Sequence, residues 1–209
     1  MNDWRLIFNV LLGSAFLVMV VIFGLSRMAG QSTSLIVDQN RLIDGAKLIK
    51  EYGETKVTIV NFSDMECPAC KRAHELMKSL DSTSGVRMIF RHFPLGIHRY
   101  SQISARAVEA ARVMGKEWEM MDLLFEKQEE WSTEVKVEDK LIEYAKSLGL
   151  EETVFKEKLN SSEVMAEVQK DLNLGNSLRL SGTPTIFVNG EQIAIDFVVA
   201  KVNELLKTY

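Results

Sequence analysis

The sequence predicts an α/β domain in which a strand–helix–strand unit and a strand–strand–helix unit are separated by a helical insertion. Runs of β-branched residues near the two ends of residues 55–209 indicate the two units, and apolar residues at helical spacing fill residues 101–180. A long uncharged segment near the amino terminus predicts a transmembrane helix before this domain. The predicted class is therefore α/β with an inserted α-helical domain, preceded by a membrane-spanning segment.

The amino-terminal segment, residues 6–25, carries no charged side chain. An α-helix rises about 1.5 Å per residue, so this segment would span about 30 Å, the thickness of the hydrocarbon core of a bilayer. A cleaved signal peptide is the alternative, but its apolar core is usually shorter, about 7 to 15 residues. We therefore expect residues 1–27 to form an uncleaved anchor, whose orientation the flanking Arg5 and Arg27 leave open.

Residues 28–54 predict a linker and a short extension that contains a helix, because apolar side chains recur there at helical spacing: Leu42, Ile43, Ala46 and Ile49. Residues 57–62 are rich in β-branched side chains and predict a buried strand. Helical spacing then follows from Ala73 to Leu80, and residues 86–90 predict a second strand. A helix that connects two strands of one sheet is typical of a parallel pair, so we expect a right-handed parallel unit.

The second unit lies at the carboxyl end of the chain. Residues 185–188 and 192–195 predict two strands on either side of Asn189-Gly190, a dipeptide that suits a tight hairpin turn. Residues 197–206 predict a closing helix. We therefore assign residues 55–100 and 181–209 to one domain and residues 101–180 to a helical insertion, in which Gly149 marks the end of one helix.

Composition excludes several classes of protein. The chain has 209 residues with 25 basic and 29 acidic side chains, and a net charge of −4 argues against nucleic acid as a partner. Two cysteines are too few for a disulfide-stabilised scaffold, and a zinc site built from cysteines alone needs four. If the two cysteines are functional, they should act as one chemical unit.

The two cysteines form the run Cys67-Pro68-Ala69-Cys70, where the first strand gives way to a helix. A cysteine at a helix amino terminus faces unpaired N–H groups and the positive end of the helix dipole, which lowers the pKa of its thiol. Pro68 suits the first helical position. We expect Cys67 to be the attacking sulfur and Cys70 the resolving one, with Pro68 and Ala69 tuning the thiolate.

These segments together resemble the DsbA-like thiol:disulfide oxidoreductases of the thioredoxin superfamily, in their membrane-anchored bacterial form. The resemblance covers about residues 55–209 and rests on a C-P-x-C run after a strand, on residues 90–95, and on Gly182-Thr183-Pro184-Thr185 before a hairpin. It implies a thioredoxin fold with an inserted α-helical domain, which is the arrangement that the periodicity predicts.

The resemblance also implies that a cis peptide bond precedes Pro184 and that this proline lies beside the cysteine pair. Only about 5% of X–Pro bonds are cis in general, so this expectation comes from the resemblance alone. Thr183 would offer its backbone to an extended substrate peptide and could contact a sulfur. An ordinary loop proline that opens an edge strand is the alternative.

Asn61 departs from the family pattern, which commonly places a buried acid six residues before the first cysteine. An asparagine cannot titrate, so a water, Asp64 or Glu66 would have to carry the proton of Cys70, or the transfer would be slow. Removing a buried negative charge favours the thiolate and therefore the reduced protein. Asn61 is thus expected to tune the thiolate and to favour an oxidase, and Asn61→Asp should lower the oxidising power.

The histidines suggest secondary roles. His92 and His98 flank Phe93-Pro94-Leu95, where we expect them to make hydrogen bonds that stabilise a turn. His74 lies seven residues after Cys67 and could tune the thiolate or, with both cysteines, bind a soft metal ion.

The function implied by the resemblance is oxidation of substrate cysteine pairs to disulfides, with Cys67 and Cys70 as the redox pair and no bound cofactor. Unfolded or exported proteins that contain cysteines would be the substrates, and a membrane protein of the DsbB or vitamin K epoxide reductase type would be the reoxidant. The domain would face the extracytoplasmic side of the cell membrane. The alternatives are a reductase or isomerase fed by a transmembrane electron donor, a membrane-tethered metal-binding chaperone and a non-catalytic peptide-binding module.

Overall fold

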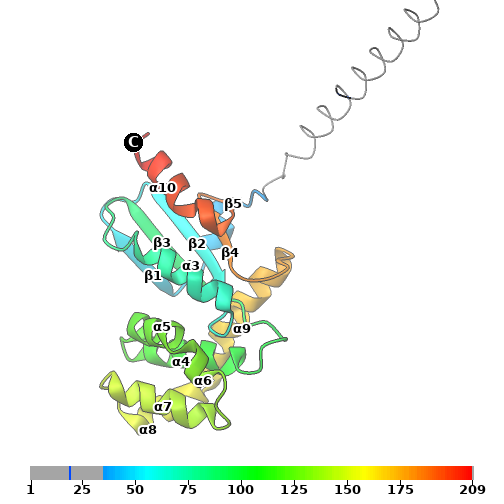
Figure 1. The fold of residues 1–209 in the computed structure, drawn as a ribbon. Coiled ribbons are helices and arrows are strands. Elements are labelled where there is room, and N and C mark those ends of the chain that lie inside the picture. Colours follow the sequence, from blue (N-terminus) through cyan, green and yellow to red (C-terminus); the bar gives the residue numbers. More distant parts are fainter. Residues whose placement is uncertain (1–18, 20–34, 209) are drawn as a thin grey trace, which may run out of the picture. The chain divides into compact units, whose positions relative to one another are not determined.

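The computed structural model describes Met19 and residues 35–208 (Figure 1). The chain divides into two compact units, Met1–Leu35 and Ile36–Tyr209, and the fold described below is that of the second unit. The predicted anchor, residues 1–27, lies outside the described residues except for Met19. Among the described residues, no helix has both the length and the apolar character needed to cross a membrane.

A mixed five-stranded sheet forms the centre of the unit, with the strand order β1-β3-β2-β4-β5. The β2 and β3 strands are parallel, as the strand–helix–strand pattern predicts, and β4 and β5 form the predicted antiparallel hairpin. β4 also pairs antiparallel with β2, and β1 with β3. The strands are β1 (Leu48–Tyr52), β2 (Val57–Ser63), β3 (Val86–His92), β4 (Thr185–Val188) and β5 (Glu191–Ile193).

Helices cover both faces of the sheet, so every residue of the central strand β2 is buried. Val57 and Ile59 pack on one face against α3 (Pro68–Lys78) and α10 (Val198–Leu206). Val60 and Phe62 pack on the other face against residues of α2 (Gln39–Ile43) and α9 (Ser162–Ser177). Burial on both sides explains why apolar residues of β2 point to both faces rather than alternating with exposed polar ones, although Thr58, Asn61 and Ser63 are also buried.

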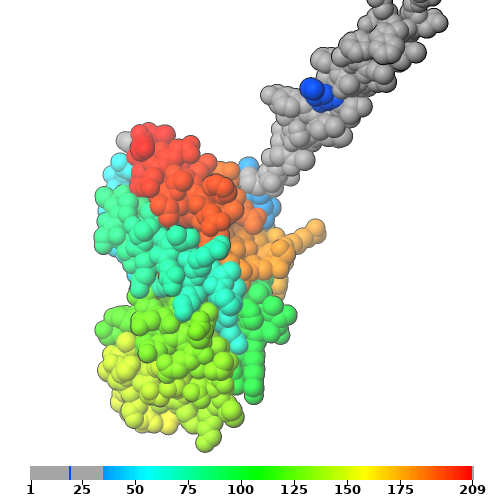
Figure 2. All heavy atoms as spheres, viewed as in Figure 1, coloured from blue at the N-terminus to red at the C-terminus, as the bar shows by residue number. Residues whose placement is uncertain are grey.

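The helical insertion packs directly against the end of the sheet where the cysteines lie, as the green and yellow parts of Figures 1 and 2 show. Its own core contains Met120, Met121, Leu124, Phe125 and Trp131, all completely or almost completely buried. Residues 36–209 form one compact unit, so the predicted boundaries of the insertion at 101 and 180 stay a prediction. Besides α9, its helices are α4 (Ser101–Val113), α5 (Glu117–Glu126), α6 (Gln128–Trp131), α7 (Val137–Ser147) and α8 (Glu152–Leu159).

The predicted helix through Ile49 is wrong in its second half. Helix α2 begins after Asp38, whose side chain accepts a hydrogen bond from the N–H of Asn40, and it ends at Ile43. Gly45 then adopts a φ of +64°, which turns the chain into β1. Ile49 is 42% exposed on this edge strand, next to the buried Leu48, so the spacing that suggested a helix is the alternation of a strand.

The ends of the last elements also differ from the prediction. Strand β5 ends at Ile193, and a 3₁₀ turn (Ile195–Phe197) precedes α10, which begins at Val198. The turn at Asn189-Gly190 is as predicted, because both residues have positive φ angles, +48° and +87°.

A buried ion pair joins the sheet to the insertion. Nη1 of Arg91 in β3 lies 2.7 Å from Oδ1 of Asp171 in α9, and the two side chains are 1% and 10% exposed. The remaining donors of Arg91 reach the carbonyl oxygens of Leu42 and Asp44, and Oδ2 of Asp171 accepts the N–H of His92. The pair therefore connects β3, α9 and the end of α2.

We predict that Asp171→Ala destabilises the protein by about 3 to 5 kcal/mol, because it leaves the guanidinium of Arg91 buried without a counter-charge. Urea unfolding gives the loss. The control is Lys146→Ala, which removes one partner of the exposed pair that Lys146 forms with Glu152, and it should leave the unfolding midpoint nearly unchanged. Equal midpoints for the two variants would contradict the structural role of the buried pair.

Candidate active site

The two cysteines lie where β2 ends and α3 begins, as the sequence predicts. Cys67 occupies the position just before the helix, with extended backbone angles (φ −80°, ψ 121°), and Pro68 is the first helical residue. The carbonyl oxygen of Cys67 accepts the N–H of Cys70 at 3.0 Å and that of Lys71 at 3.2 Å. The helix thus starts at the motif itself, and both sulfurs lie near its positive end.

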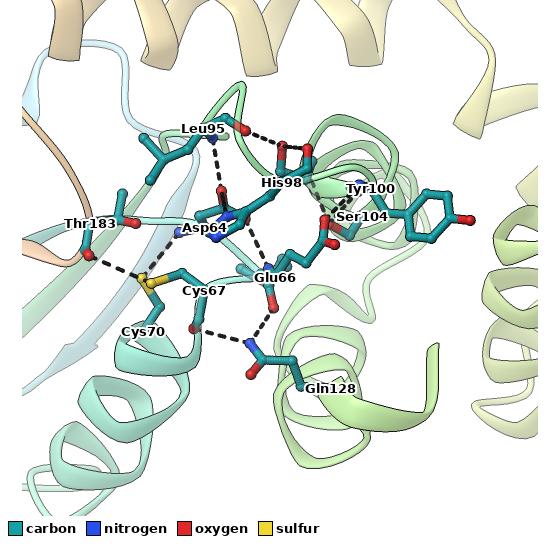
Figure 3. A network of polar contacts seen from close by, with 12 residues as sticks. Asp64, Glu66, Cys67, Cys70, Leu95, His98, Tyr100, Ser104, Gln128 and Thr183 are labelled. Atoms are coloured by element: carbon teal, nitrogen blue, oxygen red, sulfur yellow. Dashed lines mark hydrogen bonds and ion pairs between the residues drawn. The ribbon is translucent and has the colours of Figure 1, made fainter. Parts of the chain in front are cut away.

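The two thiols are both reduced and have different surroundings. Cys67 is 7% exposed, whereas Cys70 is completely buried. The Cys70 sulfur accepts a hydrogen bond from the N–H of Asp64 at 3.5 Å, and the Cys67 sulfur lies 3.6 Å from the carbonyl oxygen of Thr183 (Figure 3). Only Cys67 is therefore accessible to a reactant, while Cys70 is held behind it.

The electrostatics separate the two thiols further. A hydrogen bond from Cys70 lowers the pKa of Cys67 to about 5, against the opposing effect of burial, with further lowering by Thr183 and by the N–H groups of Cys70 and Ala69. Burial raises the pKa of Cys70, and the hydrogen bond that its thiol donates to Cys67 raises it further. At neutral pH the reduced pair therefore holds one thiolate, on Cys67, and one thiol, on Cys70.

Thr183 and Pro184 lie in the loop before β4, beside the cysteine pair. The peptide bond between them is cis, which confirms the expectation drawn from the resemblance. Both residues are partly exposed.

Asn61 lies on β2, and only 3% of its surface is exposed. Its Oδ1 atom has no hydrogen-bond partner in the described part of the chain. Asn61 lines a cavity of about 30 Å³ together with Lys50, His74 and Trp118. Because a water molecule needs about 10 to 15 Å³ when volume is measured in this way, the cavity has room for water next to the unpaired oxygen. Cys70 is not among the residues that line this cavity, so the group that carries its proton stays a prediction.

The sequence indicates Asp64 as a possible proton carrier for Cys70 but does not predict the polar network around it. The Asp64 carboxylate accepts hydrogen bonds from the N–H groups of Glu66 and Leu95 and from Nδ1 of His98, each at 2.8 Å. Glu66 in turn accepts the N–H of Tyr100 at 2.5 Å (Figure 3). The network joins the loop before α3 to the loop after β3. The expected turn-stabilising role of His98 is consistent with this contact, but the sequence contains no signal that identifies Asp64 as its partner.

Gln128 of the insertion also contacts the motif. Its side-chain nitrogen donates to the carbonyl oxygens of Met65 at 2.7 Å and of Cys67 at 3.0 Å, and the residue is 4% exposed. A buried amide from α6 thus holds the backbone at Met65 and Cys67.

His74 does not join the cysteines. Its Nε2 lies 2.6 Å from Oδ1 of Asp122, and its ring stacks on Phe125 at 4.7 Å. Within residues 35–208, no group of three His, Cys, Asp or Glu side chains is arranged to hold a metal ion. The arrangement suggested by the sequence, His74 with both cysteines, is therefore not formed.

We predict that Cys70→Ala raises the pKa of Cys67 well above about 5, because it removes the hydrogen bond that lowers this pKa most. Cys70→Ser is the matched variant: its hydroxyl can still donate, so the pKa should stay closer to that of the reduced wild type. The ultraviolet absorbance of the thiolate, followed from acid to neutral pH, gives each value. If the two variants titrate together, the hydrogen bond between the sulfurs does not control the thiolate.

Several solved structures have a fold similar to that of this chain. The fold is similar to that of oxidised BdbD from Bacillus subtilis, with a TM-score of 0.67 and 26% identity, covering 79% of this chain and 95% of that one. A thioredoxin-like oxidoreductase from Silicibacter pomeroyi gives a TM-score of 0.67 and 25% identity, covering 82% and 99% of the two chains. The thiol-disulfide exchange protein alpha-DsbA2 from Wolbachia pipientis also has a TM-score of 0.67, but at 19% identity, over 80% and 91% of the chains, it shows the fold alone.

Curated relatives match over a limited region. The Na⁺/H⁺ antiporter NhaA 3 of Salinispora tropica is 39% identical over 142 residues, which are 66% of this chain and 21% of that protein. An NhaA 1 antiporter of Salinispora arenicola is 37% identical over 141 residues, again 66% of this chain and 21% of that protein. This chain therefore spans about a fifth of the length of the curated relatives that it matches.

The family model described as thioredoxin matches residues 52–208. This region contains both cysteines and the whole sheet, apart from residues 48–51 of β1. The structure is consistent with this match. Its strand–helix–strand unit is parallel and carries the cysteine pair at the start of the helix, and a cis peptide bond precedes Pro184. The chain belongs to the thioredoxin family.

Proposed function

We propose that this protein oxidises pairs of cysteines in other proteins to disulfides, with Cys67 and Cys70 as its redox pair. One observation carries the proposal: a partly accessible thiolate at a helix amino terminus, with a completely buried thiol donating to it. The likeness to a thioredoxin-like oxidoreductase supports thiol–disulfide exchange as the class of reaction.

The reaction starts from the oxidised protein. A substrate thiolate attacks the sulfur of Cys67, a bond forms between these two sulfurs, and the bond between Cys67 and Cys70 breaks. Cys70 leaves as a thiolate and takes up a proton. A second substrate thiolate then attacks the first substrate sulfur and expels Cys67 as a thiolate. The substrate loses two electrons, the protein gains two, and no bound cofactor takes part.

The second step explains why the low pKa of Cys67 matters. A thiolate of lower pKa leaves faster, so the mixed disulfide resolves toward free Cys67 and oxidised substrate. The stable thiolate also favours the reduced protein, which makes the disulfide a stronger oxidant. The absence of a buried acid at Asn61 acts in the same direction, because no negative charge at that position opposes the thiolate.

Thr183 and Pro184 provide the contact for the substrate chain. An extended peptide can pair with the backbone of Thr183 by strand addition, which would bring its cysteine to the sulfur of Cys67. The distance of 3.6 Å between that sulfur and the Thr183 carbonyl oxygen supports this placement.

The proposal also includes the cellular location of the protein and its partners. Residues 1–27 would anchor the protein in the cell membrane, and the described domain would lie on the extracytoplasmic side, where disulfides persist. Exported, unfolded proteins would be the substrates, and a membrane protein of the DsbB or vitamin K epoxide reductase type would reoxidise the pair.

The first experiment mixes the oxidised protein with a reduced peptide that contains two cysteines. The wild type should transfer its disulfide to the peptide, as mass spectrometry of both products shows. Neither Cys67→Ser nor Cys70→Ser should do so, because a single thiol holds no intramolecular disulfide.

A second incubation distinguishes the roles of the two sulfurs. When mixed with a peptide that already contains a disulfide, Cys70→Ser should accumulate a mixed disulfide, since its Cys67 thiolate attacks and no second thiol resolves the product. Cys67→Ser should not, because Cys70 is buried and its pKa is raised. Disulfide transfer by Cys67→Ser, or equal trapping by both variants, would overturn the proposed roles.

A further inference from the structure

Asp64 lies at the centre of the network in Figure 3, beside the cysteine pair but outside the C-P-A-C run. Its side chain is 0% exposed, and its carboxylate accepts three hydrogen bonds, from the N–H groups of Glu66 and Leu95 and from His98. A carboxylate removed from water needs such donors, since a buried charge without them is strongly unfavourable. The conformation of the loop is therefore tied to this one side chain.

The backbone of Asp64 contacts both cysteines. Its N–H donates to the sulfur of Cys70 at 3.5 Å, and its carbonyl oxygen accepts the N–H of Cys67 at 3.2 Å. Because both groups belong to Asp64, a displacement of this residue would change both contacts. The side chain that fixes this residue thus also fixes the surroundings of the redox pair.

His98 is the one side chain among the three donors to Asp64. Its Nδ1 lies 2.8 Å from Oδ2, and its ring is 19% exposed. The other acidic residue of the network, Glu66, accepts the N–H of Tyr100, and so it does not compete for His98. Without His98, Oδ2 of Asp64 would keep a single donor, the N–H of Leu95.

We propose that Asp64 and His98 are positioning residues for the Cys67–Cys70 pair, in which the hydrogen bond from His98 holds the Asp64 loop and stabilises the reduced pair. The inference rests on the proposed thiol–disulfide exchange. The reduced pair carries a negative charge on Cys67, whereas the disulfide carries none. A carboxylate that loses a donor repels the thiolate more strongly, so losing His98 destabilises the reduced form and weakens the oxidant.

The test is the equilibrium of each variant with a glutathione redox buffer. His98→Ala should lower the equilibrium constant for oxidation of glutathione by about tenfold, which corresponds to about 30 mV. His98→Asn keeps an N–H donor at nearly the same distance from the backbone, and it should restore the constant to within about twofold of wild type, a shift of under about 10 mV.

Arg87→Gln is the matched control, because Arg87 also pairs with a carboxylate, that of Glu51, but makes no hydrogen bond to the cysteine loop. Its equilibrium constant should equal that of the wild type. If His98→Ala does not fold, His98→Phe keeps the ring without the donor and carries the same expectation. A wild-type constant in His98→Ala or His98→Phe, or a constant in His98→Asn as low as in His98→Ala, would overturn the positioning role.

Failure of the two proposals can be told apart, because all of these variants keep both cysteines. If the wild type itself transfers no disulfide to glutathione, the proposed function fails. If the wild type transfers its disulfide and only the His98 variants deviate from expectation, the proposed function stands and the role of Asp64 and His98 is rejected.

Discussion

The hydrogen bond that the Cys70 thiol donates to the Cys67 thiolate is the interaction on which the chemistry depends. It lowers the pKa of the outer sulfur to about 5 and raises that of the inner one, so the two thiols of one motif take different charge states. Burial adds to this difference in charge state, because Cys70 is completely buried and Cys67 is not. A symmetric, equally exposed pair would lack both a stable leaving group and a protected partner.

Several parts of the fold contact the motif and maintain this difference between the two thiols. Strand β2, buried along its whole length, sets the position at which α3 starts. Thr183 approaches Cys67 from the loop before β4, and Gln128 holds the Cys67 carbonyl oxygen from the insertion. Asp64 fixes the intervening loop through donors from another loop. Segments distant in sequence therefore hold the two sulfurs in their unequal surroundings.

The sequence predicted the elements whose signals are local. The β-branched run of β2, the cysteine pair at a helix start and the Asn189-Gly190 turn each depend on residues that are adjacent in the chain. The edge strand β1 was missed because five residues of alternation also fit a helical spacing. The contacts of His98 with Asp64 and of Gln128 with Cys67 were missed because they join residues 34 and 61 positions apart, which only the packed fold brings together. The buried ion pair between Arg91 and Asp171 could not be predicted either, because these residues are also far apart in the sequence.

The central claim is that the stable thiolate on Cys67 makes this protein an oxidant of other thiols. The measurement that tests it most directly is the reduction potential of the Cys67–Cys70 couple in the wild-type protein, obtained by equilibration with glutathione and dithiothreitol buffers. We expect a potential of about −120 mV, in the range of a strong dithiol oxidant. A potential of about −270 mV, typical of a reductase, would contradict this role.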